Sequence, residues 1–383
     1  MPIDLDVIVK VLVSLVAALV MSFAATPVVK RFAKRVGAMD VPRDNRRMHD
    51  HPIPRQGGLA IFLGFILSVA FFADVNRQIQ GVLLGSVIVV IVGAIDDILD
   101  LKPWIKFIAQ TAAAIVAVAH GIVIDILSNP WVASDIEYLQ LGWAAIPITV
   151  IWIVAITNAV NWIDGLDGLS VGVSGIASVA MLVIALLVAN GNAAIVMAAL
   201  AGACIGFMPY NINPAKIFAG DTGALLLGYV LSTMSIIGLF KFYAIVSFAA
   251  PFLILALPIF DVVFNTFRRV LHGQKPWESD RGHVHHRLID LGLTQKQAVA
   301  ILYCISTVLG LAAVVITASG EMKAVIFLLA FVVAAAVGAF ILKTTRRDSA
   351  AHNNHKNIDT KDGQDDGDDS DGDGDDGGAG DPR

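Results

Sequence analysis

Long apolar runs recur along almost the whole chain, and they constrain its fold more than any other feature. A helix crosses the hydrocarbon core of a bilayer in about 20 residues, and inside lipid only helices and closed barrels satisfy every backbone hydrogen bond. The runs cover residues 7–29, 58–75, 81–95, 104–124, 144–161, 170–189, 193–209, 222–240, 242–264, 299–318 and 323–343. The sequence therefore predicts an all-α polytopic membrane protein with about 11 transmembrane helices. Its 56% hydrophobic and 15% charged residues agree with that class.

Basic residues predict the orientation of these helices. The loop after the first run holds eight Lys and Arg residues and the loop after the ninth holds six, whereas segments 125–143, 190–192 and 319–322 hold none. Because basic loops stay in the cytoplasm, the pattern places the amino terminus outside and the carboxyl terminus inside. The even-numbered helices then lead outward.

The first apolar run has a rival interpretation as a secretory signal. Asp4 and Asp6 precede the run and a basic cluster follows it, which is the reverse of the charge order in a signal peptide. A retained first helix is therefore expected. Cys204 and Cys304 both fall inside apolar runs, where they predict small buried side chains and no disulfide framework.

The composition changes abruptly near the carboxyl end. Residues 348–383 contain 12 Asp against three basic residues, and such a segment buries too little apolar surface to fold. We expect a polytopic domain over residues 1–347 and an acidic, disordered tail over residues 348–383. The spacing of the tail's Asp and Gly residues matches no EF-hand loop.

Polar motifs occupy the loops that are predicted to be cytoplasmic. They are VPRDNRRMHDHPIPRQGG (41–58), DDILDLKPWIK (96–106), NAVNWIDGLDG (158–168), NINPAKIFAGDTG (211–223) and ESDRGHVHHR (278–287). A metal-dependent transporter, the alternative class, needs polar groups near the membrane midplane and on both sides of a central site. Polar loops on one side favour an enzyme that works at the inner membrane surface.

The acidic residues of these loops predict a bound cation. Asp96, Asp97 and Asp221 offer hard oxygen ligands, which suit Mg²⁺, with Mn²⁺ as the alternative, when phosphates share the coordination. Basic residues that could hold anionic groups are Lys102, Lys106, Arg281 and Arg287. Carboxylates, a divalent cation and basic side chains are the components of phosphoryl transfer.

Plainer interpretations compete with a catalytic one at three places. An adjacent pair of Asp residues at a helix end is often a solvated cap. His283 and His285 could bind a transition metal, but no cysteine accompanies them, which favours contacts with phosphate or substrate. Asp261, in PIFDVVFNTFRR, is expected to pair with nearby arginines rather than to act in catalysis.

In combination, the Asp pair, NAVNWIDGLDG, the NP–x₅–GDTG arrangement and HVHHR resemble the polyprenyl-phosphate N-acetylhexosamine-1-phosphate transferases, over roughly residues 7–343. The resemblance implies a bacterial inner-membrane enzyme with its active site facing the cytoplasm. The implied reaction transfers GlcNAc-1-phosphate from UDP-GlcNAc to undecaprenyl phosphate and releases UMP. It would begin a cell-envelope polysaccharide, such as O-antigen, common antigen or a teichoic-acid linkage unit.

Another branch of that family makes lipid I from UDP-MurNAc-pentapeptide. The branch typically shows a triple-histidine motif followed by an acidic residue, whereas this chain reads HVHHRL. The segment PIPRQGGLAIF is also similar to the members that transfer GlcNAc. The resemblance therefore favours UDP-GlcNAc, with the pentapeptide donor and other N-acetylhexosamine donors as alternatives.

The resemblance also implies roles for individual residues. Asp221 would coordinate the metal with Asp97 beside it, either Asp96 or Asp97 would ready the lipid phosphate as the catalytic residue, and Lys106 would lie near that phosphate. The nucleotide-sugar side is assigned to Asn158, Asn161, Asp164, Asp167, Asn211, Phe218, His283, His285, His286 and Arg287. Asn211 and Phe218 would contact the uracil, the latter by stacking. The expected partners are UDP-GlcNAc, undecaprenyl phosphate and the lipid bilayer, with no nucleic acid, and a homodimer is left open.

Overall fold

The computed structural model describes residues 4–42, 51–128, 138–238, 245–271 and 282–318. In this part of the chain, seven helices are long and apolar enough to cross a membrane, by length and composition. They are α1 (Leu5–Val36), α3 (Arg77–Leu99), α5 (Ala145–Trp162), α6 (Leu169–Leu187), α7 (Gly191–Asn211), α8 (Gly220–Gly238) and α12 (Gln295–Ala318). The all-α membrane class predicted from the sequence is confirmed.

Shorter elements connect these helices. The helices are α2 (Gly58–Phe72), α4 (Pro103–Ala119), the 3₁₀ turn η1 (Gly142–Ala144), α9 (Ile245–Ile254), α10 (Ala256–Leu271) and α11 (Val284–Asp290). The strands are β1 (Met39–Asp40), β2 (Ile53–Pro54), β3 (Ile126–Ser128) and β4 (Tyr138–Gln140). Strands β1 and β2 pair antiparallel, as do β3 and β4. These two small ribbons were not predicted from the sequence.

The ninth predicted span, 242–264, is not one continuous helix. Helix α9 ends at Ile254 and α10 begins at Ala256. Pro258 explains the break, because proline lacks an N–H and its ring clashes with the carbonyl four residues earlier. The predicted span 323–343 and the tail 348–383 lie outside the described residues. The number of eleven helices therefore stays a prediction.

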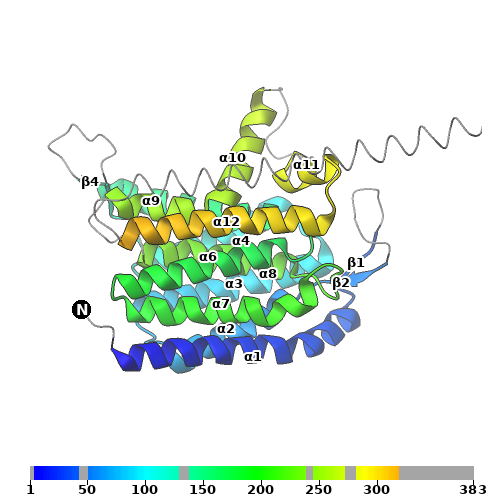
Figure 1. The fold of residues 1–383 in the computed structure, drawn as a ribbon, viewed down its shortest axis with the longest axis horizontal. Helices are drawn as coiled ribbons and strands as arrows, with labels where there is room; N and C mark the ends of the chain where they lie inside the picture. Colours follow the sequence, from blue (N-terminus) through cyan, green and yellow to red (C-terminus); the bar gives the residue numbers. More distant parts are fainter. Residues whose placement is uncertain (1–3, 43–50, 129–137, 239–244, 272–281, 319–383) are drawn as a thin grey trace, which may run out of the picture. The chain divides into compact units, whose positions relative to one another are not determined.

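Helix α8 forms the centre of the bundle. All of its residues from Thr222 to Gly238 are buried. Helices α3, α5, α6 and α2 pack against it, while α1 packs mainly against α7 and α2. Figure 1 shows these helices running side by side along one direction, with α10 projecting away from them.

Helices α1 and α7 approach each other backbone to backbone. A Cβ atom at Gly202 would lie 2.1 Å from the carbonyl oxygen of Leu15, and one at Gly206 would lie 2.2 Å from that of Leu19. In addition, the Ser14 hydroxyl donates to the carbonyl of Ile195 at 3.1 Å. Helix α1 is thus a packed member of the bundle.

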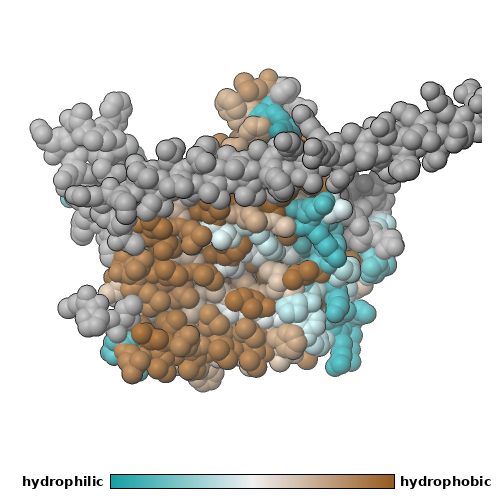
Figure 2. Space-filling model, in the orientation of Figure 1, coloured by the Kyte–Doolittle hydropathy of each residue, from teal (hydrophilic) through white to brown (hydrophobic). Residues whose placement is uncertain are grey.

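The surface of the bundle divides along its length. Figure 2 shows hydrophobic surface over most of the visible face and hydrophilic surface at the end where β1 and β2 lie. Exposed apolar side chains from several helices contribute to the hydrophobic part, among them Leu12, Val16, Ile91, Ile151 and Leu311. A soluble protein would bury such side chains, so this distribution suits a molecule surrounded by lipid.

Candidate active site

Three helix ends bring two carboxylates to one ammonium group. Asp96 lies in the last turn of α3, Asp221 in the first turn of α8 and Lys106 in the first turn of α4. The Lys106 Nζ atom lies 3.1 Å from Oδ2 of Asp96 and 2.8 Å from Oδ2 of Asp221. Asn161, at the end of α5, donates to the same Asp221 oxygen at 3.3 Å. Four predicted residues from three of the polar motifs therefore form one cluster.

Asp97 has different surroundings from its neighbour Asp96. Its Oδ1 accepts from the N–H of Asp221 at 2.9 Å, and its Oδ2 accepts from the hydroxyl of Thr222 at 2.5 Å and from the N–H of Thr222 at 3.3 Å. The first N–H groups of a helix have no partner inside the helix, and a negative charge there is favoured by the helix dipole. Asp97 thus fixes the start of α8, whereas Asp96 shares a cation with Asp221.

The cluster suits a divalent cation in its donor chemistry. Among the described residues, no three His, Cys, Asp or Glu side chains group as a ready-made metal site. However, Asp96 and Asp221 each direct one oxygen at a single cation, the Lys106 ammonium, and the Asp221 side chain is 24% exposed. Two hard oxygen ligands at a partly exposed position fit Mg²⁺, which usually takes its remaining ligands from water and phosphate.

Asp167 ties the loop after α5 to the loop after α7, and Asn211 holds the latter loop to the end of α7. Asp167 accepts from the Asn213 amide at 2.9 Å and from the N–H of Ala215 at 3.0 Å. The Asn211 amide donates to the carbonyl of Ile217 at 3.1 Å and is only 3% exposed. Both side chains therefore shape the loops in this structure.

Two further predicted residues lie on either side of the cluster. Asn158 forms a reciprocal amide pair with Gln110, which joins α5 to α4. Phe218 is held through its backbone, because its N–H donates to the carbonyl of Pro54 at 2.9 Å and its carbonyl accepts from Gly57 at 2.8 Å. The phenyl ring of Phe218 is partly exposed, as a stacking contact with a base would require.

Asp164 lies in the loop between α5 and α6 and accepts from the Ser170 hydroxyl at 2.5 Å. Burial raises the pKa of Asp164 to about 7, with further contributions from the charges of Asp221 and Asp167, although the Ser170 hydrogen bond and Arg55 oppose this rise. An unfolded chain ionises Asp near pH 4. Between about pH 4 and 7 the folded state therefore binds more protons than the unfolded state, and stability falls as the pH rises.

Replacement of Asp164 with Asn separates its effect on stability from its effect on function. We expect Asp164→Asn to melt at a higher temperature than the wild type at pH 8, where the wild-type carboxylate carries the cost of its partial burial, and at the same temperature at pH 5. Product formation at pH 8 should fall about tenfold or more, because a hydrogen bond to a charged group contributes about 1.5–3 kcal/mol. Equal melting temperatures at pH 8 would contradict the burial of this charge.

The predicted histidines form a second cluster. His283 Nδ1 lies 2.6 Å from Oδ2 of Asp261, and the rings of His283 and His285 stack at 5.6 Å. His285 is 3% exposed and packs on Gly165, where a Cβ would lie 2.2 Å from its Nε2. Burial, reinforced by His286, lowers the pKa of His285 to about 3, so this ring is neutral at physiological pH. His285 thus joins the histidine cluster to the loop after α5.

Arg287 and His286 complete this second cluster. The guanidinium of Arg287 lies 4.7 Å from the ring centroid of Phe264 on α10, a cation–π contact that leaves its N–H donors for an anion. The ring centroids of His285 and His286 lie 4.3 Å apart. Of the four predicted residues in this motif, His285 is the one that the fold buries most clearly.

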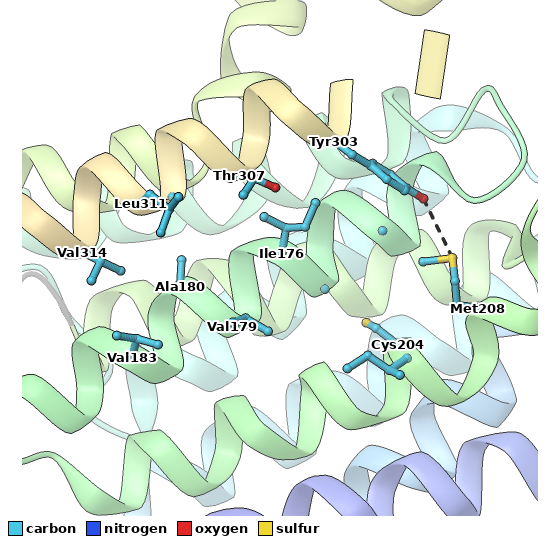
Figure 3. A pocket seen from close by; sticks show the side chains of 14 residues that line it. Ile176, Val179, Ala180, Val183, Cys204, Met208, Tyr303, Thr307, Leu311 and Val314 are labelled. Atoms are coloured by element: carbon cyan, nitrogen blue, oxygen red, sulfur yellow. Dashed lines mark hydrogen bonds between the residues drawn. The ribbon is translucent and has the colours of Figure 1, made fainter. Parts of the chain in front are cut away.

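An apolar groove between α6, α7 and α12 is unsuited to the chemistry. The cavity measures about 430 Å³, and Figure 3 shows Ile176, Val179, Leu311 and Val314 among its lining side chains. None of the lining residues is a carboxylate, histidine or basic residue. At one end the Tyr303 hydroxyl donates to the carbonyl of Gly168 at 2.5 Å, which links α12 to the loop after α5.

Sequence reasoning missed the residues that hold the predicted ones in place. Thr222, Gln110 and Asn213 are the partners of Asp97, Asn158 and Asp167. Thr222 and Asn213 stand inside the quoted motifs, but nothing in a single sequence shows which of two neighbouring polar residues faces the ligand. Gln110 lies one turn after Lys106 on α4, and this helical spacing was an available signal.

Comparison with known proteins decides the family. Residues 79–239 match the family model described as glycosyl transferase family 4. Over 312 residues, the chain is 39% identical to a probable undecaprenyl-phosphate N-acetylglucosaminyl 1-phosphate transferase of Bacillus subtilis, covering 80% of this chain and 85% of that protein. The chain belongs to glycosyl transferase family 4.

Two further relatives represent differently named members of glycosyl transferase family 4. A decaprenyl-phosphate N-acetylglucosaminephosphotransferase of Mycobacterium tuberculosis is 32% identical over 324 residues, which cover 76% of this chain and 78% of that protein. A phospho-N-acetylmuramoyl-pentapeptide-transferase of Caldicellulosiruptor bescii is 29% identical over 236 residues, which cover 59% and 72%. The family-model match includes the cluster of Asp96, Lys106 and Asp221 but ends before the histidine motif.

Proposed function

We propose that this protein transfers GlcNAc-1-phosphate from UDP-GlcNAc to undecaprenyl phosphate and releases UMP. The observation that carries the proposal is the pairing of Asp96 and Asp221 on Lys106, at the meeting point of three helix ends in a chain of this family. The name of the Bacillus subtilis relative supports the transferred group and the acceptor. The reaction would start a cell-envelope polysaccharide.

The geometry supports different roles for the two adjacent carboxylates. An oxygen of the lipid phosphate attacks the β-phosphorus of UDP-GlcNAc, a new P–O bond forms, and the bond to the leaving UMP breaks. Lys106 is suited to hold the incoming phosphate, since an ammonium has three N–H donors and the two carboxylates engage two of them. Asp96 shares that ammonium, which supports it as the carboxylate that would meet the lipid phosphate. Asp97 acts through the backbone of α8 and orients Asp221.

We also propose Mg²⁺ as the cofactor, with Mn²⁺ as a substitute. Asp221 and Asp96 would hold the ion. Asp97 would not contact the ion but would fix the backbone of Asp221, whose N–H donates to Asp97. When bound, the cation neutralises charge on the diphosphate. Lys106 would then balance the charge that remains on the lipid phosphate.

The acceptor's hydrocarbon chain accounts for the membrane-spanning body. Moving a C55 chain into water would cost roughly 0.8 kcal/mol for each buried CH₂ group, so the acceptor approaches from within the bilayer, whereas UDP-GlcNAc approaches from the cytoplasm. The proposed location is the inner membrane of a bacterium, with the site on the cytoplasmic side. Asp96, Lys106 and Asp221 lie at helix ends, where both substrates could meet.

A product assay tests the proposal. Purified protein would receive radiolabelled UDP-GlcNAc or UDP-MurNAc-pentapeptide with undecaprenyl or decaprenyl phosphate and Mg²⁺, and lipid-linked product and UMP would be measured. We expect product from UDP-GlcNAc, none from the pentapeptide donor, and loss of product with EDTA that Mg²⁺ or Mn²⁺ restores. Efficient use of the pentapeptide donor would instead support phospho-N-acetylmuramoyl-pentapeptide transfer, the activity in the name of the Caldicellulosiruptor bescii relative. Absence of any lipid product would refute a transferase.

Accessibility of introduced cysteines tests the orientation. In a background without Cys204 and Cys304, cysteines at positions 132 or 191 are expected to react with an impermeant thiol reagent added to intact cells. Cysteines at positions 50 or 279 should react only after the cells are opened. These positions follow from the distribution of basic residues, and a reversed labelling pattern would place the site on the outer face.

A further inference from the structure

Helix α10 carries a buried polar stripe opposite an exposed apolar face. Asp261, Asn265 and Arg269 are 1%, 0% and 3% exposed, and their spacing of four residues puts them on one side of the helix. On the other side, Phe260 and Phe267 are 58% and 63% exposed. The helix is therefore polar toward the protein and apolar away from it.

The buried stripe contacts the segment that carries the histidine motif. Oδ1 of Asp261 accepts from the N–H of Val284 at 2.7 Å, and its Oδ2 lies 2.6 Å from Nδ1 of His283. Asn265 supports the carboxylate, since its amide donates to the Asp261 carbonyl at 2.8 Å and to Oδ1 at 3.2 Å. Asp261 thus binds both the backbone and the ring at the start of α11.

The contact defines which nitrogen of His283 carries a proton. Nδ1 lies 2.6 Å from Oδ2 of Asp261 and 3.1 Å from the amide nitrogen of Asn265. Because an ionised carboxylate only accepts hydrogen bonds and is the nearer partner, we assign the proton to Nδ1, which donates to Asp261. The ring is also confined by Trp162, whose centroid lies 6.2 Å away at 73°, and by the stacked ring of His285. Trp162 ends α5, directly before the loop that contains Asp164. The imidazole is therefore held at the junction of the two clusters, with Nε2 left for another partner.

We propose that Asp261 is a positioning residue, which sets the tautomer and orientation of His283 so that Nε2 meets the phosphates of the nucleotide sugar. This inference rests on the proposed function and extends it to a carboxylate outside the three acidic loops. A neutral ring offers an Nε2 acceptor and a protonated ring offers an Nε2 donor, and in both forms Asp261 keeps the proton on Nδ1. In the protonated form, the Nε2–H group is a donor for an anionic oxygen.

A double-mutant cycle tests whether Asp261 acts through His283. We expect Asp261→Asn and His283→Gln each to lower kcat/KM for UDP-GlcNAc by about 10–100-fold, the usual loss when a carboxylate that orients a histidine is removed. The double variant should be no worse than His283→Gln alone, and Asp261→Glu should recover part of the activity. Additive losses would overturn the proposal, because two independent residues would then be involved.

A spectroscopic measurement separates positioning from general damage to the fold. In protein labelled with ¹⁵N-histidine, the His283 signal, assigned by its loss in His283→Gln, should report a proton on Nδ1 in the wild type and a changed tautomer in Asp261→Asn. The matched control is Asp40→Asn, which removes another buried carboxylate, paired with Arg55 at 2.7 Å, and should leave the His283 signal unchanged. An unchanged signal in Asp261→Asn would refute the role. Because this measurement needs no substrate, its result is independent of whether UDP-GlcNAc is the donor.

Discussion

Replacing Asp221 with Asn is expected to lower the rate of lipid-product formation by about 10²–10³-fold, the usual effect of removing one contact that stabilises a transition state. The loss arises because the variant removes the carboxylate that shares Lys106 with Asp96. The Asn side chain keeps the size and the partner Asn161, so the folded protein should survive. Steady-state rates and melting temperatures of the purified variant provide the measurement, and the Mg²⁺ concentration for half-maximal rate should rise.

Two further variants make this result specific. Asp125→Asn changes an exposed carboxylate that lies outside the polar motifs. This variant should leave both the rate and the stability unchanged. Asp97→Asn should lower the melting temperature as well as the rate, because an amide group would place N–H donors against the N–H groups at the start of α8. Near-normal turnover in Asp221→Asn would exclude the cluster as the site of catalysis.

Gly58→Ala is expected to disrupt the site through the backbone alone. A Cβ atom at this position would lie 2.1 Å from the Gly223 nitrogen and 2.3 Å from its Cα, and neither atom can move without displacing α8. Overpacking of this kind costs about 1–3 kcal/mol or more, and the shift would be transmitted to Asp221, two residues before Gly223. We expect a lower melting temperature and at least a tenfold loss of rate.

The same substitution elsewhere in the bundle provides the control. Gly238 ends α8, and a Cβ atom there would meet nothing closer than the Ala193 side chain at 4.0 Å. Gly238→Ala should therefore behave like the wild type in both measurements. Wild-type rate and melting temperature in Gly58→Ala would contradict the close approach of α2 to α8 at Gly58 and Gly223.

The class and most of the helices could be predicted because burial in lipid imposes a simple rule on sequence. A run of about 20 apolar residues is visible without knowledge of its neighbours. The break between α9 and α10 was harder to predict, since Pro251 lies inside α9 and Pro258 lies in the first turn of α10, just after the break. Both prolines stand in one apolar run, and the sequence alone does not show which of them accompanies a break in the helix.

The sequence indicated which residues could come together in the cluster, but not which atoms each of them contacts. Asp96, Asp97, Lys106 and Asp221 were all identified from residue type and position in the loops. The sequence could not show that Asp97 faces the start of α8, because that depends on where α8 lies relative to α3. The contacts of Asp261 were not predictable for the same reason. Its partner proved to be His283 in the next loop, a contact between distant residues that no local pattern reveals.

The close packing of α1 on α7 also sets an order of assembly during synthesis. The carbonyls of Leu15 and Leu19 meet glycines that the ribosome adds about 190 residues later, a delay of roughly 10–40 s at 5–20 residues per second. Until then α1 has only lipid and early neighbours such as α2 as partners. Helix α1 is therefore in the membrane before its main packing partner has been synthesised. In a chain arrested on the ribosome before Gly202, we expect α1 to lack its contacts with α7.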